Sequence, residues 1–189
     1  MILRKALICA TGAALISLST ASVASATPFF NPFNGHYYEL IVGEYTWAQA
    51  LADAATHTYD PAGPPPPMQG HLVTINDGSE NTILTGEVPN NGYWIGATDN
   101  GAEGTWRWAA GPEAGTTIGY ANWNPGQPDN AGGAENWATK NLFGPEWNDW
   151  CLTCHTNYVV EYEGAAVPEP ASLILLATGA GSLFLRRRR

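Results

Sequence analysis

Basic residues are scarce in this chain of 189 residues. It contains eight lysines and arginines and seventeen acids, which gives a net charge of −9. Six of the eight lie near the ends, so only Arg107 and Lys140 remain between residues 27 and 166, together with sixteen acids. That middle part, two cations against sixteen anions, has a net charge of −14. Nucleic acids and anionic membranes repel so acidic a surface, whereas divalent cations are attracted to it. The charge therefore argues against nucleic-acid binding and for cation binding.

Cysteine is scarce as well, with Cys9, Cys151 and Cys154 as the three that the chain contains. The sequence also lacks a recognisable nucleophile–base arrangement, a phosphate-binding loop and a basic patch. Its length and its apolar content allow one domain of moderate size with a real hydrophobic core. We therefore expect a single folded domain that is not an enzyme.

Long apolar runs are missing, and the two short ones lie at the ends of the chain. At the start, Arg4 and Lys5 precede the apolar run 6–18, and residues 24–26 form an A-x-A cleavage site. This pattern is typical of a secretory signal peptide. We expect residues 1–26 to be removed, with Cys9, and residues 27–166 to form an exported domain whose core covers about 35–163.

The C-terminal end combines a proline motif, a short apolar segment and a basic cluster. Pro168-Glu169-Pro170 precedes the apolar residues 171–185 and the arginines 186–189. Fifteen helical residues cover about 22 Å, less than the roughly 30 Å of a bilayer core, and the arginines would remain on the cytoplasmic side. Residues 167–189 resemble the PEP-CTERM sorting signal of Gram-negative bacteria. The resemblance implies transient inner-membrane anchoring by a short transmembrane segment and removal by an exosortase, with an ordinary C-terminal anchor as the alternative.

The middle part shows the pattern of several short elements followed by a long irregular stretch. Thr46 and Gln49 have the spacing of a capping box, which predicts a helix over 46–55, and a second helix is expected to start at Asp77. A proline-rich loop is expected over 61–67. The expected strands cover residues 36–42, 71–75, 94–97, 105–108 and 158–162. Residues 109–157 have little periodicity, and so long an irregular stretch in a compact domain is usually functional.

Oxygen donors gather in this irregular stretch around Pro128. The donors are Gln127, Asp129, Glu135, Asn148 and Asp149. Calcium takes six to eight oxygen ligands, whereas zinc prefers nitrogen and sulfur. A proline between two ligands can hold a fixed turn, with a trans or a cis bond, so that both side chains point the same way. The donor set therefore predicts a calcium site.

Several short sequence motifs occur in the order found in one known family. They are Trp47-Ala48-Gln49-Ala50, Gly70-His71-Leu72-Val73-Thr74-Ile75-Asn76, Trp94-Ile95-Gly96, Gln127-Pro128-Asp129, Glu135 and Trp147-Asn148-Asp149. Across nearly the whole middle part, the chain resembles the C-type lectin-like domains. The resemblance implies an α+β fold with two helices, two small antiparallel sheets and a long ligand-binding loop. The five oxygen donors would then form the principal calcium site.

In that family the cation binds two vicinal sugar hydroxyls, which also bond to the metal ligands. By resemblance, Gln127, Asp129, Glu135 and Asn148 would contact the sugar, and Asp149 would close the cage. The Gln-Pro-Asp order is similar to the galactose-type arrangement, but no aromatic residue follows it to stack on the sugar. An auxiliary calcium site would use Asp99, Glu103, Asn130 and Glu135.

The chain departs from the family at its framework cysteines, whose positions are occupied by Ala54, Trp137, Leu152 and Val160. Two missing disulfides cost about 2–4 kcal/mol each, and eight tryptophans can compensate through the large areas that they bury. The remaining pair, Cys151 and Cys154, matches the C-x-x-C-H pattern of c-type haem attachment with His155. A small local disulfide is the simpler interpretation for an exported protein. His36, His57 and His71 are expected to be structural.

These features together predict an exported, calcium-dependent carbohydrate-binding protein of the cell surface or the exopolysaccharide matrix. Two alternatives remain open at this point. One is a non-catalytic adhesion or structural matrix protein that uses the same fold without binding sugar, and the other is a haem or thiol redox protein built on Cys151 and Cys154.

Overall fold

The computed structural model describes residues 27–61, 67–89 and 91–163. The expected signal peptide, most of the proline-rich loop and the sorting tail lie outside these residues. Among the described residues, no helix is long and apolar enough to cross a membrane. The short apolar segment 171–185, for which a membrane span was expected, is not among them.

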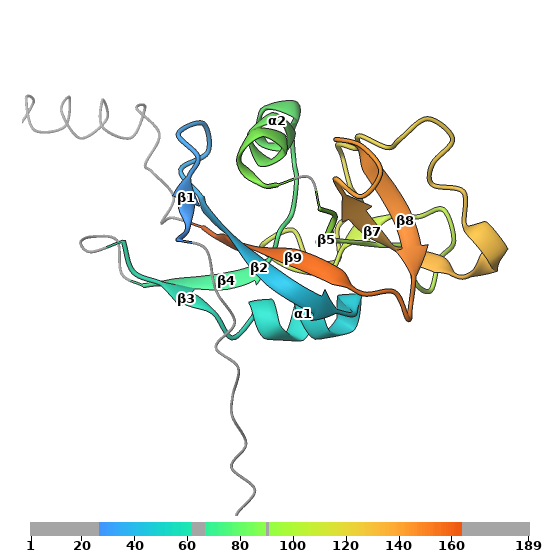
Figure 1. The fold of residues 1–189 in the computed structure, drawn as a ribbon, viewed down its shortest axis with the longest axis horizontal. Coiled ribbons are helices and arrows are strands. Elements are labelled where there is room, and N and C mark those ends of the chain that lie inside the picture. Colours follow the sequence, from blue (N-terminus) through green and yellow to red (C-terminus); the bar gives the residue numbers. More distant parts are fainter. Residues whose placement is uncertain (1–26, 62–66, 90, 164–189) are drawn as a thin grey trace, which may run out of the picture.

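In the described residues, nine strands form one mixed sheet, and β9 is the strand that connects its parts (Figure 1). The strands are β1 Phe29–Phe30, β2 Tyr37–Tyr45, β3 Thr58–Tyr59, β4 Met68–Leu72, β5 Tyr93–Thr98, β6 Arg107–Trp108, β7 Glu135–Lys140, β8 Trp147–Cys151 and β9 Thr156–Tyr162. The main path runs β1-β2-β9-β5-β7-β8. β9 pairs with β5 in parallel along its first half, and with β4 in antiparallel fashion along its second half.

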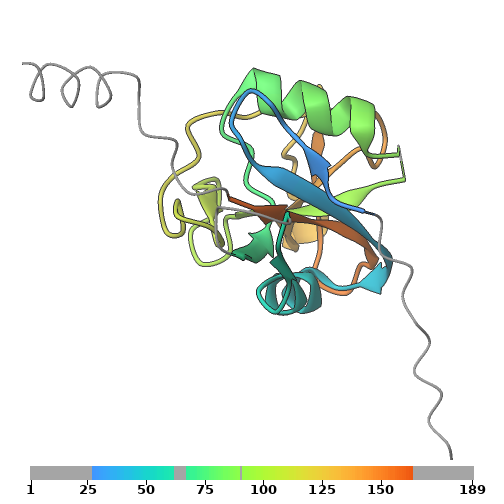
Figure 2. The same ribbon diagram turned by 90° about the vertical axis from the view of Figure 1, so that its left-hand side faces the viewer.

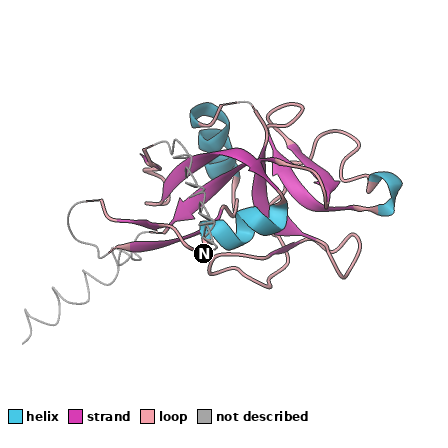
Figure 3. Cartoon of the chain, turned by 60° about the horizontal axis from the view of Figure 1, so that its bottom comes forward, coloured by secondary structure: helices cyan, strands magenta, loops and turns pink. Residues whose placement is uncertain are grey.

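The α+β class and the two helices are confirmed, but the strands join into a single sheet where two small antiparallel ones were expected. The reason is the length of β9, whose seven residues allow it to pair with both groups of strands. The short helical turn η1, Ala131–Gly133, lies at one far end of the molecule, away from both longer helices (Figure 3).

The two helices lie on opposite sides of β2 and β9 (Figure 2). Helix α1, Trp47–Ala54, begins with the predicted capping box between Thr46 and Gln49 and buries Trp47, Ala50 and Ala54. Helix α2, Gly78–Glu87, begins at Asp77, whose side chain accepts hydrogen bonds from the backbone N–H groups of Ser79 and Glu80. Both helix starts therefore follow from local capping chemistry that the sequence displays.

The strand expectations were less accurate than the helix expectations. The strand expected over 71–75 ends at Leu72, and the one expected over 105–108 is reduced to Arg107–Trp108. β7 and β8 were missed, because both lie inside the stretch interpreted as irregular. Most residues of β7 are buried consecutively, so they do not alternate between polar and apolar in the way that marks a half-buried strand.

Three of the four positions of the family's framework cysteines are occupied by buried apolar side chains. Ala54 and Val160, at one pair of positions, are both fully buried in the same core cluster. Trp137, at a third position, packs against Trp47 with 6.4 Å between ring centroids. Leu152, at the fourth, is exposed. Fully burying a large apolar side chain contributes about 1.5–3 kcal/mol, which is comparable to the contribution of a disulfide.

Candidate calcium site

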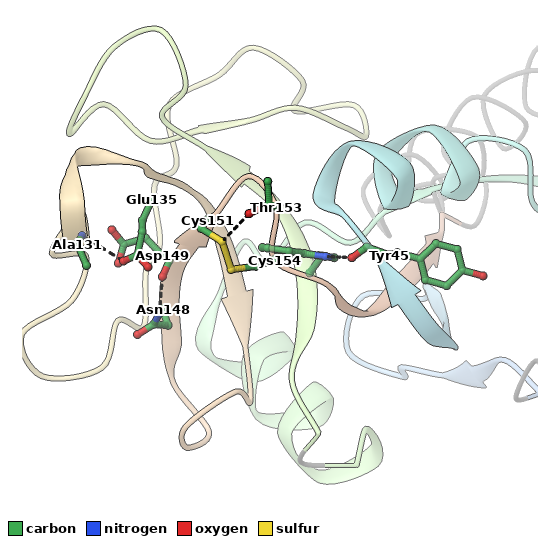
Figure 4. Close-up of a disulfide and its surroundings, with 9 residues drawn as sticks. Tyr45, Ala131, Glu135, Asn148, Asp149, Cys151, Thr153 and Cys154 are labelled. Atoms are coloured by element: carbon green, nitrogen blue, oxygen red, sulfur yellow. Dashed lines mark hydrogen bonds between the residues drawn. A yellow bond between two sulfur atoms is a disulfide. The ribbon is translucent and has the colours of Figure 1, made fainter.

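Three of the predicted ligands converge at the end of the sheet formed by β7 and β8. Asp129 lies in the preceding loop, Glu135 begins β7 and Asp149 lies in β8. One carboxylate oxygen from each lies within 4.8 Å of the others. Figure 4 shows Glu135 and Asp149 side by side on these two strands. The fold thus brings together three carboxylates that are up to 20 positions apart in the sequence.

Asp149 holds the loop against the sheet. Its carboxylate is fully buried and accepts hydrogen bonds from the backbone N–H groups of Asp129, at 3.2 Å, and Asn130, at 2.8 Å. Asn130 adopts a left-handed conformation with φ of 47°, which asparagine tolerates better than most residues. The peptide bond between Gln127 and Pro128 is cis. Asp149 therefore shapes the loop as well as contributing a carboxylate to the cluster.

The two predicted amide ligands flank the carboxylates. The Gln127 side-chain oxygen accepts a hydrogen bond of 3.1 Å from the Asp129 backbone N–H. Asn148 is buried, and its amide NH₂ donates to the backbone carbonyl of Asp149 (Figure 4). The NH₂ of Asn148 is thus directed to that carbonyl. Among the described contacts no donor bonds to its amide oxygen, so this oxygen can serve as a ligand atom.

The charge of this cluster is unbalanced within the described part of the chain. Burial raises the pKa of Glu135, and the negative charges of Asp149 and Asp129 raise it further, against the N–H of Ala131 that donates to it. Neither basic side chain of the domain compensates, because Arg107 bonds to the Gly115 carbonyl and Lys140 to Thr85 and Pro145. A divalent cation would offset this repulsion, and the oxygen-only donor set fits calcium.

The residues expected to form an auxiliary site are only partly brought together. The Asn130 amide donates to Glu103 at 2.5 Å and its oxygen accepts from the Glu135 backbone N–H at 3.1 Å. Asp99 is directed elsewhere, since one carboxylate oxygen accepts from the Gly104 N–H at 2.8 Å. Its other oxygen is buried without a hydrogen-bond partner. Neither Asp99 nor Glu103 belongs to the carboxylate cluster found among the described residues.

Cys151 and Cys154 form a disulfide in the turn between β8 and β9 (Figure 4). Both sulfur atoms are used in this bond, so neither thiol is free for attachment of haem. The structure therefore favours the local disulfide over the haem alternative that the C-x-x-C-H pattern left open.

The entrance of the long loop is fixed by backbone contacts that the sequence did not reveal. The Trp147 backbone N–H donates to the Asn122 carbonyl at 2.7 Å, and its carbonyl accepts from the Asn124 N–H at 2.8 Å. The rings of Trp123 and Trp147 meet edge to face with centroids 5.5 Å apart. The closely spaced tryptophans were the available signal, but their pairing could not be inferred without the fold.

Comparison with known proteins agrees with this geometry. Residues 67–158 match the family model described as Lectin C-type domain, and residues 166–189 match that of the PEP-CTERM protein-sorting motif. The fold and the site thus define a C-type lectin domain, a non-catalytic carbohydrate-binding class. The chain belongs to the C-type lectin domain proteins and carries in addition a PEP-CTERM motif, which indicates export and sorting to the cell envelope.

The chain is similar to parts of proteins that differ greatly in length. The chain is 33% identical over 171 residues to halomucin of Haloquadratum walsbyi, covering 82% of this chain and 2% of halomucin. It is 34% identical over 102 residues to perlucin of Haliotis laevigata, covering 51% of this chain and 63% of perlucin. The chain therefore spans less than two thirds of these relatives, whose full activities cannot be transferred to it.

Solved structures of the same fold cover most of the described domain. The mouse scavenger receptor C-type lectin carbohydrate-recognition domain is 25% identical with a TM-score of 0.58, covering 74% of this chain and 99% of that one. The C-type lectin CEL-I from Cucumaria echinata is 22% identical with a TM-score of 0.57, covering 69% and 91% respectively, and shows likeness of fold alone.

Proposed function

We propose that this domain binds carbohydrate in a calcium-dependent manner through Gln127, Asp129, Glu135, Asn148 and Asp149. The observation that carries the proposal is the convergence of Asp129, Glu135 and Asp149 within 4.8 Å, with no basic side chain in contact among the described residues. Membership of a carbohydrate-binding family supports it independently.

Each residue has a separate task in the proposed site. Asp149 holds the loop and closes the cation cage, while Asp129 and Glu135 bind the cation and accept hydrogen bonds from sugar hydroxyls. Gln127 and Asn148 offer an amide oxygen to the cation and an N–H to the sugar. Asn148 directs its NH₂ to the Asp149 carbonyl, but an amide carries two hydrogens, so one remains for a sugar oxygen. Bound calcium would supply the coordination of two neighbouring sugar hydroxyls.

We propose a weaker auxiliary calcium site at Asp99, Glu103, Asn130 and Glu135. It is supported by the buried Asp99 oxygen that lacks a hydrogen-bond donor and by the bond between Asn130 and Glu103. Asn130 contributes no charge, and fewer charged ligands weaken a calcium site. A calcium titration that saturates at one equivalent would contradict the auxiliary site and leave the principal one intact.

Calcium should stabilise the full chain and should be required for it to bind glycans. A ligand at 100 times its dissociation constant adds about 2.7 kcal/mol to the free energy of unfolding, which for a domain of this size raises the melting temperature by several degrees. Magnesium should do much less, because its rigid octahedron fits such a cage poorly. The measurements are thermal unfolding and a glycan array, each with calcium and with chelator.

The two readouts separate the proposal from its alternative. Identical melting curves in calcium and in chelator would exclude the calcium site. A melting temperature that rises with calcium, with no glycan retained on the array, would favour an adhesion or structural matrix protein in which the ion only stabilises the fold.

The ends of the chain support a proposed route to the cell envelope. Signal peptide 1–26 would direct export, segment 171–185 would anchor the protein transiently in the inner membrane, and an exosortase would remove the tail. Changing Pro168, Glu169 and Pro170 to alanine should leave uncleaved protein in the membrane fraction of a host that has the sorting enzyme. Normal release of this variant, followed by immunoblotting of cell fractions, would leave only an ordinary C-terminal anchor.

A further inference from the structure

A second group of ligating side chains lies on and directly beside three adjacent strands of the sheet. It is away from the calcium loop, which is the loop of residues 127–135 that carries proposed calcium ligands. In the register of the sheet, Glu161 of β9 is opposite Tyr38 of β2 on one side and opposite His71 of β4 on the other. Residues two positions apart on a strand point to the same face. His36 directly precedes β2 and Glu163 directly follows β9, and both reach that face, since His36 contacts Glu161 and Glu163 contacts His71.

Three of these four side chains already have ligand atoms close together, and the fourth, His71, lies near two of them. His36 Nδ1 lies 2.7 Å from Glu161 Oε1, and His71 Nε2 lies 3.3 Å from Glu163 Oε1 and 3.9 Å from Glu161 Oε2. The ligand atoms of His36, Glu161 and Glu163 all lie within 4.8 Å of one another. Zinc with bonds of about 2.0–2.1 Å places neighbouring ligands about 3.3–3.4 Å apart. His71 is not part of the group of three, so its side chain would have to move closer to complete a tetrahedral site.

The hydrogen bonding of this cluster leaves one nitrogen unsatisfied. His71 Nε2 is buried and has no hydrogen-bond partner, although two carboxylates lie near it. The 3.3 Å to Glu163 is an ion-pair distance, so this nitrogen is placed by charge and not by a well-aligned hydrogen bond. A buried polar atom without a partner is costly, and a nitrogen directed between two carboxylates is suited to a metal ion.

Carboxylates outnumber histidines in and around the cluster. Glu161 is 1% exposed, and Glu163 lies beside it. Two further carboxylates are near, since Glu80 on α2 accepts from the Tyr38 hydroxyl at 2.5 Å and Glu113 lies 3.5 Å from the Thr74 hydroxyl that bonds to Glu161. No lysine or arginine is among the hydrogen-bond or ion-pair partners of these groups in the described residues.

We propose that His36, His71, Glu161 and Glu163 form a binding site for a divalent transition-metal ion, with Zn²⁺ as the ion that fits best. Two imidazole nitrogens with two carboxylates match the preferences of zinc and not those of calcium. The site does not share a residue with the calcium loop and does not depend on the proposed function. It would join the start of β2 to the end of β9 and to β4, in a chain that lacks the framework disulfides.

The test uses the full chain without a histidine tag, stripped of metal with chelator. Zn²⁺ alone should bind and raise the melting temperature, and Co²⁺ should give the visible absorption of a four-coordinate site. Each of the variants His36→Gln and His71→Gln should weaken Zn²⁺ binding by at least about 100-fold, since even losing a second-shell partner costs 10–100-fold. The variant Glu163→Gln changes a half-buried side chain at the end of the fold, so it serves if the histidine variants do not fold.

Two matched variants control the assignment. His155→Gln removes an exposed histidine and should leave Zn²⁺ binding unchanged. Glu87→Ala removes an exposed carboxylate at the end of α2 and should do the same. Failure of Zn²⁺ to bind the unmodified chain would overturn the proposal. So would equal Zn²⁺ affinity in the unmodified chain and in the His36, His71 and Glu163 variants, because the four side chains would then form ion pairs only.

Discussion

Replacing Asp149 with alanine should abolish calcium binding and glycan binding together. The carboxylate of Asp149 is fully buried, belongs to the cluster with Asp129 and Glu135, and accepts the two backbone N–H groups that fix the loop. The alanine variant therefore loses one charged ligand and the position of the others at the same time. The expected result is no calcium-dependent rise in melting temperature and no glycan retained on the array.

Two variants calibrate this result. Asp149→Asn retains an oxygen acceptor for the loop but loses the charge, so it should keep the loop and weaken calcium binding by at least about tenfold, which is 1.4 kcal/mol. Glu87→Ala removes an exposed carboxylate at the end of α2 and should leave calcium binding unchanged. If the Asp149→Ala protein folds and still shows the full calcium effect, the proposed principal site is wrong.

The stability of the Asp149→Ala variant without calcium does not report on the calcium site, because the substitution has two opposing effects on the free energy of unfolding. Losing the carboxylate leaves two backbone N–H groups without their acceptor, which costs about 1–3 kcal/mol for each buried donor that finds no other partner. The same change removes a buried negative charge from beside two others, which is favourable. The difference between the melting curves with calcium and with chelator cancels both effects.

Local chemistry explains which parts of the fold could be predicted from the sequence. The capping residues Thr46 and Asp77 are within a few positions of the helices that they start, so both helix starts were predictable. The convergence of Asp129, Glu135 and Asp149 was predictable because their chemistry and their order resemble a known site. Strand β7 was not, because its burial pattern is continuous and gives no alternation to detect.

The cluster of His36, His71, Glu161 and Glu163 shows the limit of a reading from sequence alone. Its histidines were expected to be merely structural, because they are 35 residues apart and far from the two glutamates in the chain. Their proximity depends on the register of β2, β9 and β4. A shift of one residue in any of these strands would turn its side chains to the other face.

Replacing Trp147 with alanine should cause the largest loss of stability. This side chain is fully buried, and its ring meets those of Trp108, Tyr120 and Trp123 edge to face at centroid distances of 6.1, 5.9 and 5.5 Å. Truncating a buried tryptophan to alanine costs about 3–5 kcal/mol, a large share of the roughly 5–15 kcal/mol that stabilises a typical domain. Urea unfolding of the full chain, followed by circular dichroism in the presence of chelator, would measure the loss.

Trp147→Phe separates the ring packing from the hydrogen bond. The indole Nε1 donates to the Asn81 side chain of α2 at 3.0 Å, and Asn81 is itself buried. Phenylalanine keeps most of the ring contacts but leaves that acceptor unpaired, so the expected loss is about 1–3 kcal/mol. Trp150→Ala, on the same strand but only partly buried, should cost less than Trp147→Ala.

The same variants show how far the calcium loop depends on the core. Trp147 directly precedes Asn148 and Asp149, and its backbone holds the entrance of the loop through residues 122 and 124. Its side chain fills the core beneath that entrance, so the cavity left by alanine should let the loop move and weaken calcium binding, whereas phenylalanine should preserve it. Equal urea midpoints for the alanine variant and the unmodified chain would show that Trp147 does not anchor the core. A large loss of stability with unchanged calcium affinity would show instead that Asp149 positions the loop without support from the tryptophan core.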